Sequence, residues 1–335
     1  MPPYPRLSRL SRLPAAPGRR LVLGTTLAAL AALSLAPAAT AADGDWPRRI
    51  EHEAGTLVLD APPQRVVSTS PSLTGTLLAL DVPLVATAAA TRSPLTDDAG
   101  FFRQWAEIAH DRGVAVLYPN LAFDFEALLI QDADLVVASA SGADSILPHV
   151  AELQAMGIPV AVFDYARNDW KELARQIGRA TGHEAQARDM ARDFTARAKA
   201  AAAQMTRPEG TASIVAYNFA GNYGVSKPIS AQARVLAELG FEVTGLPEAM
   251  RDRVMQSREY DFISHENLPG AITGDSIFLL NGTPEAVERF MADPVLANLP
   301  AVQAGQVYPL GPLSFRVDYY SGLTIIETLM PYFSE

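Results

Sequence analysis

Cysteine is absent from the 335 residues of this chain, and histidine and lysine are scarce. Without cysteine the chain forms no disulfide and carries no lipid on an N-terminal cysteine. The five histidines are widely spaced, so a compact zinc or manganese site would have to be assembled from distant segments. We therefore expect no metal bound directly by the protein. The histidines are His52, His110, His149, His183 and His265.

Basic residues are outnumbered by acidic ones, 27 to 37, and the formal net charge is −10. Five arginines precede position 21, and without them 22 basic residues face 37 acidic ones, a formal charge of −15. This charge excludes nucleic acid as a partner. Only three basic residues are lysine, so most of the positive charge is on planar guanidinium groups, which suit fixed contacts with anions.

The common catalytic motifs are also missing. The sequence has no G-x-S-x-G, no P-loop, no H-E-x-x-H, and no G-x-G-x-x-G at the start of a helical period. Nothing in the sequence therefore argues for an enzyme, and a binding protein is the simpler hypothesis.

Residues 1–42 have the pattern of a secretory signal peptide. The five arginines are followed by the apolar run LVLGTTLAALAALSLA and the small-residue stretch PAATAAD. No later apolar stretch reaches about 18 residues, so we expect a cleaved signal and a protein free in the periplasm. Arg19 and Arg20 leave both the general secretory route and the twin-arginine route open.

From position 64 onward, short β-branched runs alternate with helical periods, which is typical of parallel β/α units. The runs at 65–70, 133–140 and 158–165 predict strands of one α/β lobe. A second series begins with TASIVAYNF at 211–219.

Between these two series, the segment from 168 to 205 is rich in Ala, Arg, Gln and acids, with apolar positions at helical spacing. It predicts a long helix, with a break at 181–185 because Gly182 disfavours continuity. We expect two Rossmann-like α/β lobes joined by this helix, with a ligand pocket between them. The expected boundaries are 43–165 for the first lobe, 166–207 for the interlobe helix and 208–335 for the second lobe.

Four segments together resemble a known family. They are DWPRRI (45–50), RVVSTSPSLTGTLLALDVPL (65–84), GFFRQWAEIA (100–109) and FRVDYYSG (315–322). The chain resembles the periplasmic ferric-enterobactin-binding proteins, which are class III, helical-backbone substrate-binding proteins of iron–siderophore ABC importers. This resemblance implies a monomer that captures a ferric catecholate siderophore and delivers it to an inner-membrane ABC permease. It also implies that the siderophore's own oxygens hold the iron and that the protein needs no cofactor.

The same resemblance suggests which side chains bind the ligand. A ferric tris-catecholate carries negative charge and three aromatic rings, which guanidinium groups and aromatic faces complement. Arg316 matches a basic pocket residue of the family. Tyr319 and Tyr320 are further candidates, although helical neighbours about 100° apart cannot both face one pocket. Asp318 is expected either to orient Arg316 or to cap the terminal helix.

Three more candidates come from segments where the match is less complete. Arg103 of FFRQW matches the family, but it equally fits a residue that caps the helix or covers Trp105. Pro94 stands where the family has an arginine, with Arg92 two residues earlier. In the second lobe, Tyr223 is the aromatic residue nearest to the position of a family tryptophan. These departures leave the identity of the siderophore open.

Two glutamates match the positions through which the family docks on its permease. Glu126 in the first lobe and Glu266 in the second each precede an expected core strand. Either residue alone would be interpreted as a solvated helix carboxylate, but their corresponding placement in the two lobes favours a docking role.

Two alternatives remain at this point. A haem or cobalamin carrier of the same fold would need an axial tyrosine or histidine directed into the cleft in the haem case. An exported enzyme, such as an esterase acting on siderophore lactones, would need a nucleophile that no motif in the sequence reveals.

Overall fold

The computed structural model describes residues 45–219, 221–252 and 254–334, and all of them belong to one compact unit. The expected signal peptide, residues 1–42, lies outside the described residues. In this part of the chain, every helix is too short or too polar to cross a bilayer.

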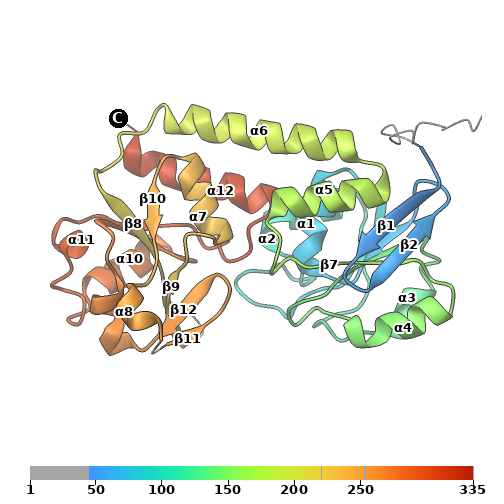
Figure 1. The fold of residues 1–335 in the computed structure, drawn as a ribbon, viewed down its shortest axis with the longest axis horizontal. Coiled ribbons are helices and arrows are strands. Elements are labelled where there is room, and N and C mark those ends of the chain that lie inside the picture. The colour runs from blue at the N-terminus through green and yellow to red at the C-terminus, as the bar shows by residue number, and fades with distance from the viewer. Residues whose placement is uncertain (1–44, 220, 253, 335) are drawn as a thin grey trace, which may run out of the picture. The chain divides into compact units, whose positions relative to one another are not determined.

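A parallel sheet in the order β5-β4-β3-β6-β7 forms the first lobe. Its edge strand β7 is labelled in Figure 1. All residues of β3, β6 and β7 are buried, as in parallel sheets that are covered on both faces. The chain runs from β3 to β4 on one side and later places β6 on the other side of β3, so a topological switch point lies between β3 and β6. The elements are β3 (Val66–Ser68), α1 (Pro71–Ala79), β4 (Leu84–Thr87), α2 (Arg103–Asp111), β5 (Ala115–Val116), α3 (Phe125–Leu129), β6 (Leu135–Ser139), α4 (Leu147–Ala155) and β7 (Val160–Phe163).

An antiparallel hairpin of β1 (Arg48–His52) and β2 (Gly55–Leu59) precedes this sheet. The backbone N–H of Glu53, in its turn, donates to the carbonyl of Val162 in β7 at 2.9 Å. The hairpin is thereby fastened to the edge of the first lobe.

The second lobe contains a seven-stranded mixed sheet. Strands β10, β8, β13 and β14 are parallel, whereas β9, β12 and β11 continue the sheet by antiparallel pairing. The elements are β8 (Thr211–Phe219), β9 (Asn222–Ser226), α7 (Ala231–Glu238), β10 (Glu242–Thr244), α8 (Glu248–Arg251), β11 (Met255–Gln256), β12 (Tyr260–Ile263), the 3-10 helix η1 (His265–Asn267), α9 (Leu268–Ala271), β13 (Ser276–Leu279), α10 (Pro284–Met291), α11 (Pro300–Gln303) and β14 (Val307–Pro309).

Two consecutive helices, α5 (Trp170–Thr181) and α6 (Glu184–Ala202), connect the two sheets (Figure 1). The side chain of Asp169 caps α5 by accepting a hydrogen bond from the backbone of Glu172 at 2.9 Å. The helix ends at Gly182, whose φ of 81° is left-handed and free of steric cost for glycine. The break expected within 181–185 lies at this glycine.

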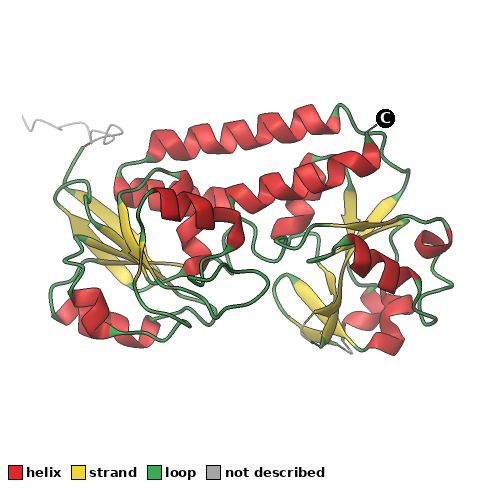
Figure 2. Ribbon diagram, turned by 180° about the vertical axis from the view of Figure 1, so that it is seen from behind, coloured by secondary structure: helices red, strands yellow, loops and turns green. Residues whose placement is uncertain are grey.

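The C-terminal helix α12 (Tyr319–Phe333) runs beside α6 (Figures 1 and 2). It contacts α1 and α2 of the first lobe as well as α7 and β14 of the second. One apolar cluster accordingly includes Leu135 and Ile214 from the two sheets together with Phe194 of α6 and Leu329 of α12. The lobes therefore share this cluster, and each lobe also has a smaller apolar cluster of its own.

The contact of α12 with α1 is so close that only glycine fits there. A Cβ on Gly75 would lie 2.2 Å from Oδ2 of Asp318, the N-cap of α12, and 2.9 Å from Cδ1 of Trp105. Gly75 thus allows the first lobe to cover the buried N-terminus of α12.

We expect Gly75→Ala to destabilise the protein by about 1–3 kcal/mol, because overpacking at Asp318 outweighs the higher helix propensity of alanine. The measurement is urea unfolding followed by circular dichroism. Gly270→Ala, where the nearest atom to the added Cβ is 3.7 Å away, is the matched control and should leave stability nearly unchanged. Equal stability of the two variants would contradict this packing.

Candidate functional site

Two adjoining cavities, of about 140 Å³ and 40 Å³, lie between the first sheet and the segment 313–318 that precedes α12. Their first-lobe walls follow the carboxyl ends of β3, β6 and β7, where ligands bind in open parallel sheets. The second-lobe walls are the segment after β14, the first residues of α7, and Glu259. The residues that line both cavities are Pro71, Ser72, Phe102, Gln104, Tyr165, Phe315 and Arg316.

Arg316 is the cation of this interlobe site. Its guanidinium carbon lies 4.9 Å from the centre of the Tyr165 ring and 4.6 Å from that of Phe315. It forms no ion pair with any described carboxylate. A guanidinium held between aromatic faces keeps its hydrogen-bond donors available for an anion.

Behind the ring of Tyr165 lies a buried carboxylate. Oδ1 of Asp144 accepts a hydrogen bond from the Tyr165 hydroxyl at 2.7 Å, and Oδ2 accepts one from Oγ of Ser70 at 2.5 Å. Ser70 follows β3 and Asp144 follows β6, so this pair bridges the topological switch point of the first sheet. Burial, and then the nearby Asp144, raises the pKa of Tyr165 to about 12, and the phenol stays neutral at ordinary pH.

Asp318 caps α12 and does not pair with Arg316. Its Oδ1 accepts from the backbone N–H of Ser321 at 2.9 Å. In return, the Ser321 hydroxyl oxygen accepts from the backbone N–H of Asp318 at 2.9 Å, which completes a capping box. Burial raises the pKa of Asp318 against the effect of these hydrogen bonds. Of the two roles expected for this residue, the structure has the helix cap.

Tyr319 and Tyr320 lie on other sides of α12 and line neither cavity. The hydroxyl of Tyr319 donates to Asp193 of α6 at 2.6 Å, and its ring packs edge-on against Trp170. Tyr320 is half-buried near Arg112, and burial raises its pKa to about 12. Their contacts are those of residues that fasten α12, and a ligand role for either stays a prediction.

Arg103 and Arg92 are exposed at the border of the site. Nε of Arg103 donates to the carbonyl of Pro94 at 3.0 Å, which ties the loop containing Arg92 to the start of α2. Ala90 and Leu95 of the same loop line the larger cavity, whereas the two arginines do not. Their contact with a ligand also stays a prediction.

Tyr223 lies in a different, more open depression of about 710 Å³ in the second lobe. Its ring packs against those of His265 and Tyr217, with centroids 4.9 Å and 5.6 Å away. Tyr223 is thus separate from the lining around Arg316, and its ligand role remains a prediction.

The two glutamates expected to dock on a permease are both exposed. Glu126 is in the first turn of α3, before β6, and Glu266 is in η1, before β13. Both strands flank the first strand of their own sheet, β3 and β8 respectively. The two carboxylates therefore occupy corresponding places in the two lobes.

A hydrogen-bond network anchors the turn that carries Glu266. Oδ2 of Asp293 contacts Nε2 of His265 at 2.5 Å and accepts from the Tyr217 hydroxyl at 2.6 Å, and its other oxygen accepts from the backbone of Val295 at 2.9 Å. Burial raises the pKa of Asp293, but these hydrogen bonds together lower it by more, so the pKa lies below its ordinary value.

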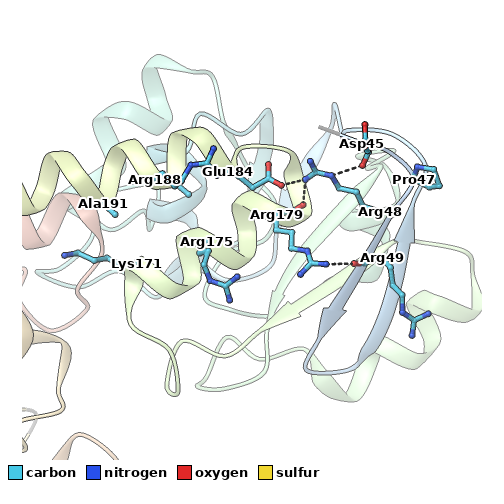
Figure 3. A pocket seen from close by; sticks show the side chains of 11 residues that line it. Asp45, Pro47, Arg48, Arg49, Lys171, Arg175, Arg179, Glu184, Arg188 and Ala191 are labelled. Atoms are coloured by element: carbon cyan, nitrogen blue, oxygen red, sulfur yellow. Dashed lines mark hydrogen bonds and ion pairs between the residues drawn. The ribbon is translucent and has the colours of Figure 1, made fainter. Parts of the chain in front are cut away.

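A groove of about 600 Å³, larger than the two interlobe cavities, lies between the β1 hairpin and helices α5 and α6 (Figure 3). Lys171, Arg175 and Arg179 follow one another along one side of α5. Most of the charge is compensated, so the groove is not a strong anion site. The ion pairs are Arg48 with Glu184, Arg49 with Glu51, Lys171 with Glu238, and Arg175 with Glu172.

The lining of the interlobe site contains four carboxylates and one cation. Asp144 is hydrogen-bonded to Tyr165 and Ser70, and the other three are paired or disfavoured as anions. Asp169 is paired with Arg234. Burial raises the pKa of Glu259, as it does for Asp318. Among the described residues, no three histidines or carboxylates converge as a metal site would require.

Residues 66–312 match the family model described as periplasmic binding protein. The chain belongs to the periplasmic binding protein family. Its two α/β lobes and interlobe helices are the architecture of that family's class III members, as the sequence predicted.

The family includes relatives that match over nearly the whole chain. The ferric enterobactin-binding periplasmic protein FepB of Escherichia coli O6:H1 is 37% identical over 317 residues, 93% of this chain and 96% of FepB. The structure of holo-ViuP is 34% identical, has a TM-score of 0.79, and covers 87% of this chain and 96% of its own. Streptococcus pneumoniae PiaA in complex with ferrichrome shares the fold, with a TM-score of 0.64 at 20% identity over 84% of this chain and 96% of PiaA.

Sequence reasoning missed Tyr165, Phe102, Phe315 and Asp144 as lining residues. A signal was present, because Tyr165 is the last residue of the predicted strand at 158–165, and ligands bind at the carboxyl ends of parallel strands. Phe315 adjoins Arg316 in the quoted segment, and Phe102 adjoins Arg103. In both places the charged residue was predicted to bind the ligand and its aromatic neighbour was not.

We expect Asp293→Asn to lower the free energy of unfolding at pH 7, by an amount that shrinks as the pH falls below about 4. A carboxyl whose pKa is lower in the folded state stabilises the fold above its unfolded pKa, and this stabilisation is lost as the pH falls through the folded pKa. Urea unfolding between pH 7 and pH 3 measures it. Asp98→Asn, the same change at an exposed site, is the control. A difference from wild type that is constant with pH would be the contrary result.

Proposed function

We propose that this protein captures a ferric siderophore of the catecholate type in the interlobe site and delivers it to an inner-membrane ABC permease. The observation that carries the proposal is the setting of Arg316, a guanidinium that pairs with no described carboxylate and lies between the rings of Tyr165 and Phe315 at the carboxyl edge of the first sheet. Near-full-length similarity to FepB supports the same ligand class.

The chemistry of such a ligand matches this wall. Catecholate oxygens carry the negative charge of the ferric complex and accept hydrogen bonds from a guanidinium, while the catechol rings stack on aromatic side chains. The siderophore's oxygens complete the coordination of the iron, so the protein supplies no ligand to the metal. The protein is accordingly a carrier and not an enzyme, and the siderophore should leave it chemically unchanged.

The larger cavity, about 140 Å³, is smaller than the 300–1,000 Å³ of ordinary small-molecule pockets. Binding therefore requires the loops around Arg316 to separate. Since the lobes share a core and two interlobe helices, we propose a modest opening in which Arg92 and Arg103 swing toward the ligand from their exposed loop.

We also propose that the mature protein is a periplasmic monomer, divided into lobes 43–165 and 208–335 by the interlobe segment 166–207. Glu126 and Glu266 would each contact a basic pocket of the permease. Beside Glu126, Leu129 and Ile130 are 43% and 79% exposed, and two adjacent exposed apolar side chains suit a surface that a partner covers.

Arg316→Ala should weaken binding of ferric enterobactin about 10- to 100-fold, the range expected for losing charge-assisted hydrogen bonds. Quenching of tryptophan fluorescence on titration measures the affinity. Arg192→Ala, on the exposed side of α6, is the control and should bind as the wild type does. Mass spectrometry of the recovered ligand should return intact siderophore. Unchanged affinity of Arg316→Ala would remove this residue from the site, and hydrolysed ligand would favour an esterase.

Glu126→Ala and Glu266→Ala should each leave ligand affinity unchanged but reduce stimulation of ATP hydrolysis by the cognate permease in proteoliposomes. The double variant should be weaker than either single one, because each lobe would lose its contact. Glu152→Ala, an exposed helix carboxylate of the first lobe, is the matched control. Full stimulation by the double variant would exclude these residues from docking.

A further inference from the structure

The ring of Tyr165 is held in one orientation by a hydrogen bond to Asp144, by a close fit against Gly142 and by its contact with Arg316. Its hydroxyl donates to Asp144, and the second oxygen of that carboxylate is fixed by Ser70. Asp144 is 6% exposed and Ser70 is fully buried, so water does not compete for these hydrogen bonds.

Gly142 leaves the space that this arrangement needs. A Cβ at Gly142 would lie 1.6 Å from the Tyr165 hydroxyl oxygen and 2.9 Å from Oδ1 of Asp144, and its φ of 80° independently favours glycine. The hydroxyl of Tyr165 therefore fits into a recess in the loop after β6. This close fit excludes a loosely placed surface tyrosine.

The opposite end of this chain of contacts is Arg316, whose guanidinium carbon lies 4.9 Å from the ring centre. A phenol that donates to a carboxylate has a more electron-rich ring, and such a ring attracts a cation more strongly. The negative charge of Asp144 thus acts on Arg316 through the ring, without an ion pair that would occupy the guanidinium donors.

We propose that Tyr165 is a ligand-binding residue that holds Arg316 in its binding orientation, and that Asp144 and Ser70 are positioning residues that fix the Tyr165 ring. This inference rests on the proposed function, because it concerns the same site. It assigns to the first lobe an aromatic face that, together with Phe315, flanks Arg316 of the second lobe, so both lobes contribute to the anion-binding surface.

The first test needs no ligand. In ¹H–¹⁵N spectra of the full mature chain, the side-chain N–H resonance of Arg316, identified by its loss in Arg316→Ala, should show an upfield ring-current shift. The contribution of Tyr165 to this shift should be lost in Tyr165→Leu, which leaves only that of Phe315, and should become smaller in Tyr165→Phe and Asp144→Asn, which keep the ring but weaken its anchor. Tyr118→Phe is the control. It removes a first-lobe hydroxyl that donates to the carbonyl of Thr69, and it should leave the Arg316 shift unchanged. An Arg316 resonance that is the same in wild type and Tyr165→Leu overturns the proposal.

The second test uses ferric enterobactin as the probe and a double-variant cycle. Tyr165→Leu should weaken binding about 3- to 30-fold, as expected for loss of a partly desolvated cation–π contact. The same change in an Arg316→Ala background should have a clearly smaller effect, because only the direct contact of the ring with the ligand is then lost, whereas a merely structural role for Tyr165 would weaken binding equally in both backgrounds. Equal losses would therefore overturn the proposal. If the wild-type protein bound no ferric catecholate, the proposed function would fail, while the ligand-free resonance would still decide whether Tyr165 holds Arg316.

Discussion

The burial of the N-terminus of α12 against α1 is the contact on which the interlobe site depends. Asp318 caps the helix inside the protein, and Gly75 of the first lobe leaves the space for its carboxylate. Arg316 lies two residues before this cap, so the contact that joins the lobes also fixes the backbone of the residue proposed to bind the ligand. The segment FRVDYYSG therefore both joins the lobes and lines the interlobe site, which explains why it combines charged, aromatic and small residues.

The site joins Arg316 and Phe315 of the second lobe to the Tyr165 ring of the first. The cation is needed to bind an anion, because the face of an aromatic ring is itself negative. The carboxylates of the lining are kept from opposing an anionic ligand by capping a helix, by burial that favours their neutral form, or by bonding to hydroxyls. Its suitability for an anion thus comes from the arrangement of charges, since the protein as a whole is acidic.

Local sequence patterns predicted much of the fold. β8 has the limits of the β-branched run at 211–219, and the break between α5 and α6 lies at Gly182, as propensity indicates. The antiparallel strands β9, β11 and β12 were not anticipated, because strands of two to five residues contain too few positions to show a clear alternation. In the site, Arg316 was identified from its segment, whereas Tyr165 and Asp144 are brought together only by the order of strands in the sheet, which sequence spacing does not encode.

The apolar cluster shared by both sheets has a consequence for how the molecule comes apart. Each sheet also packs against a cluster of its own, but residues such as Phe194 and Leu329 belong to a core that includes strands from both. Loss of one lobe would expose the apolar side chains that the other lobe contributes to this shared core, so the unfolding of one half is energetically coupled to that of the other.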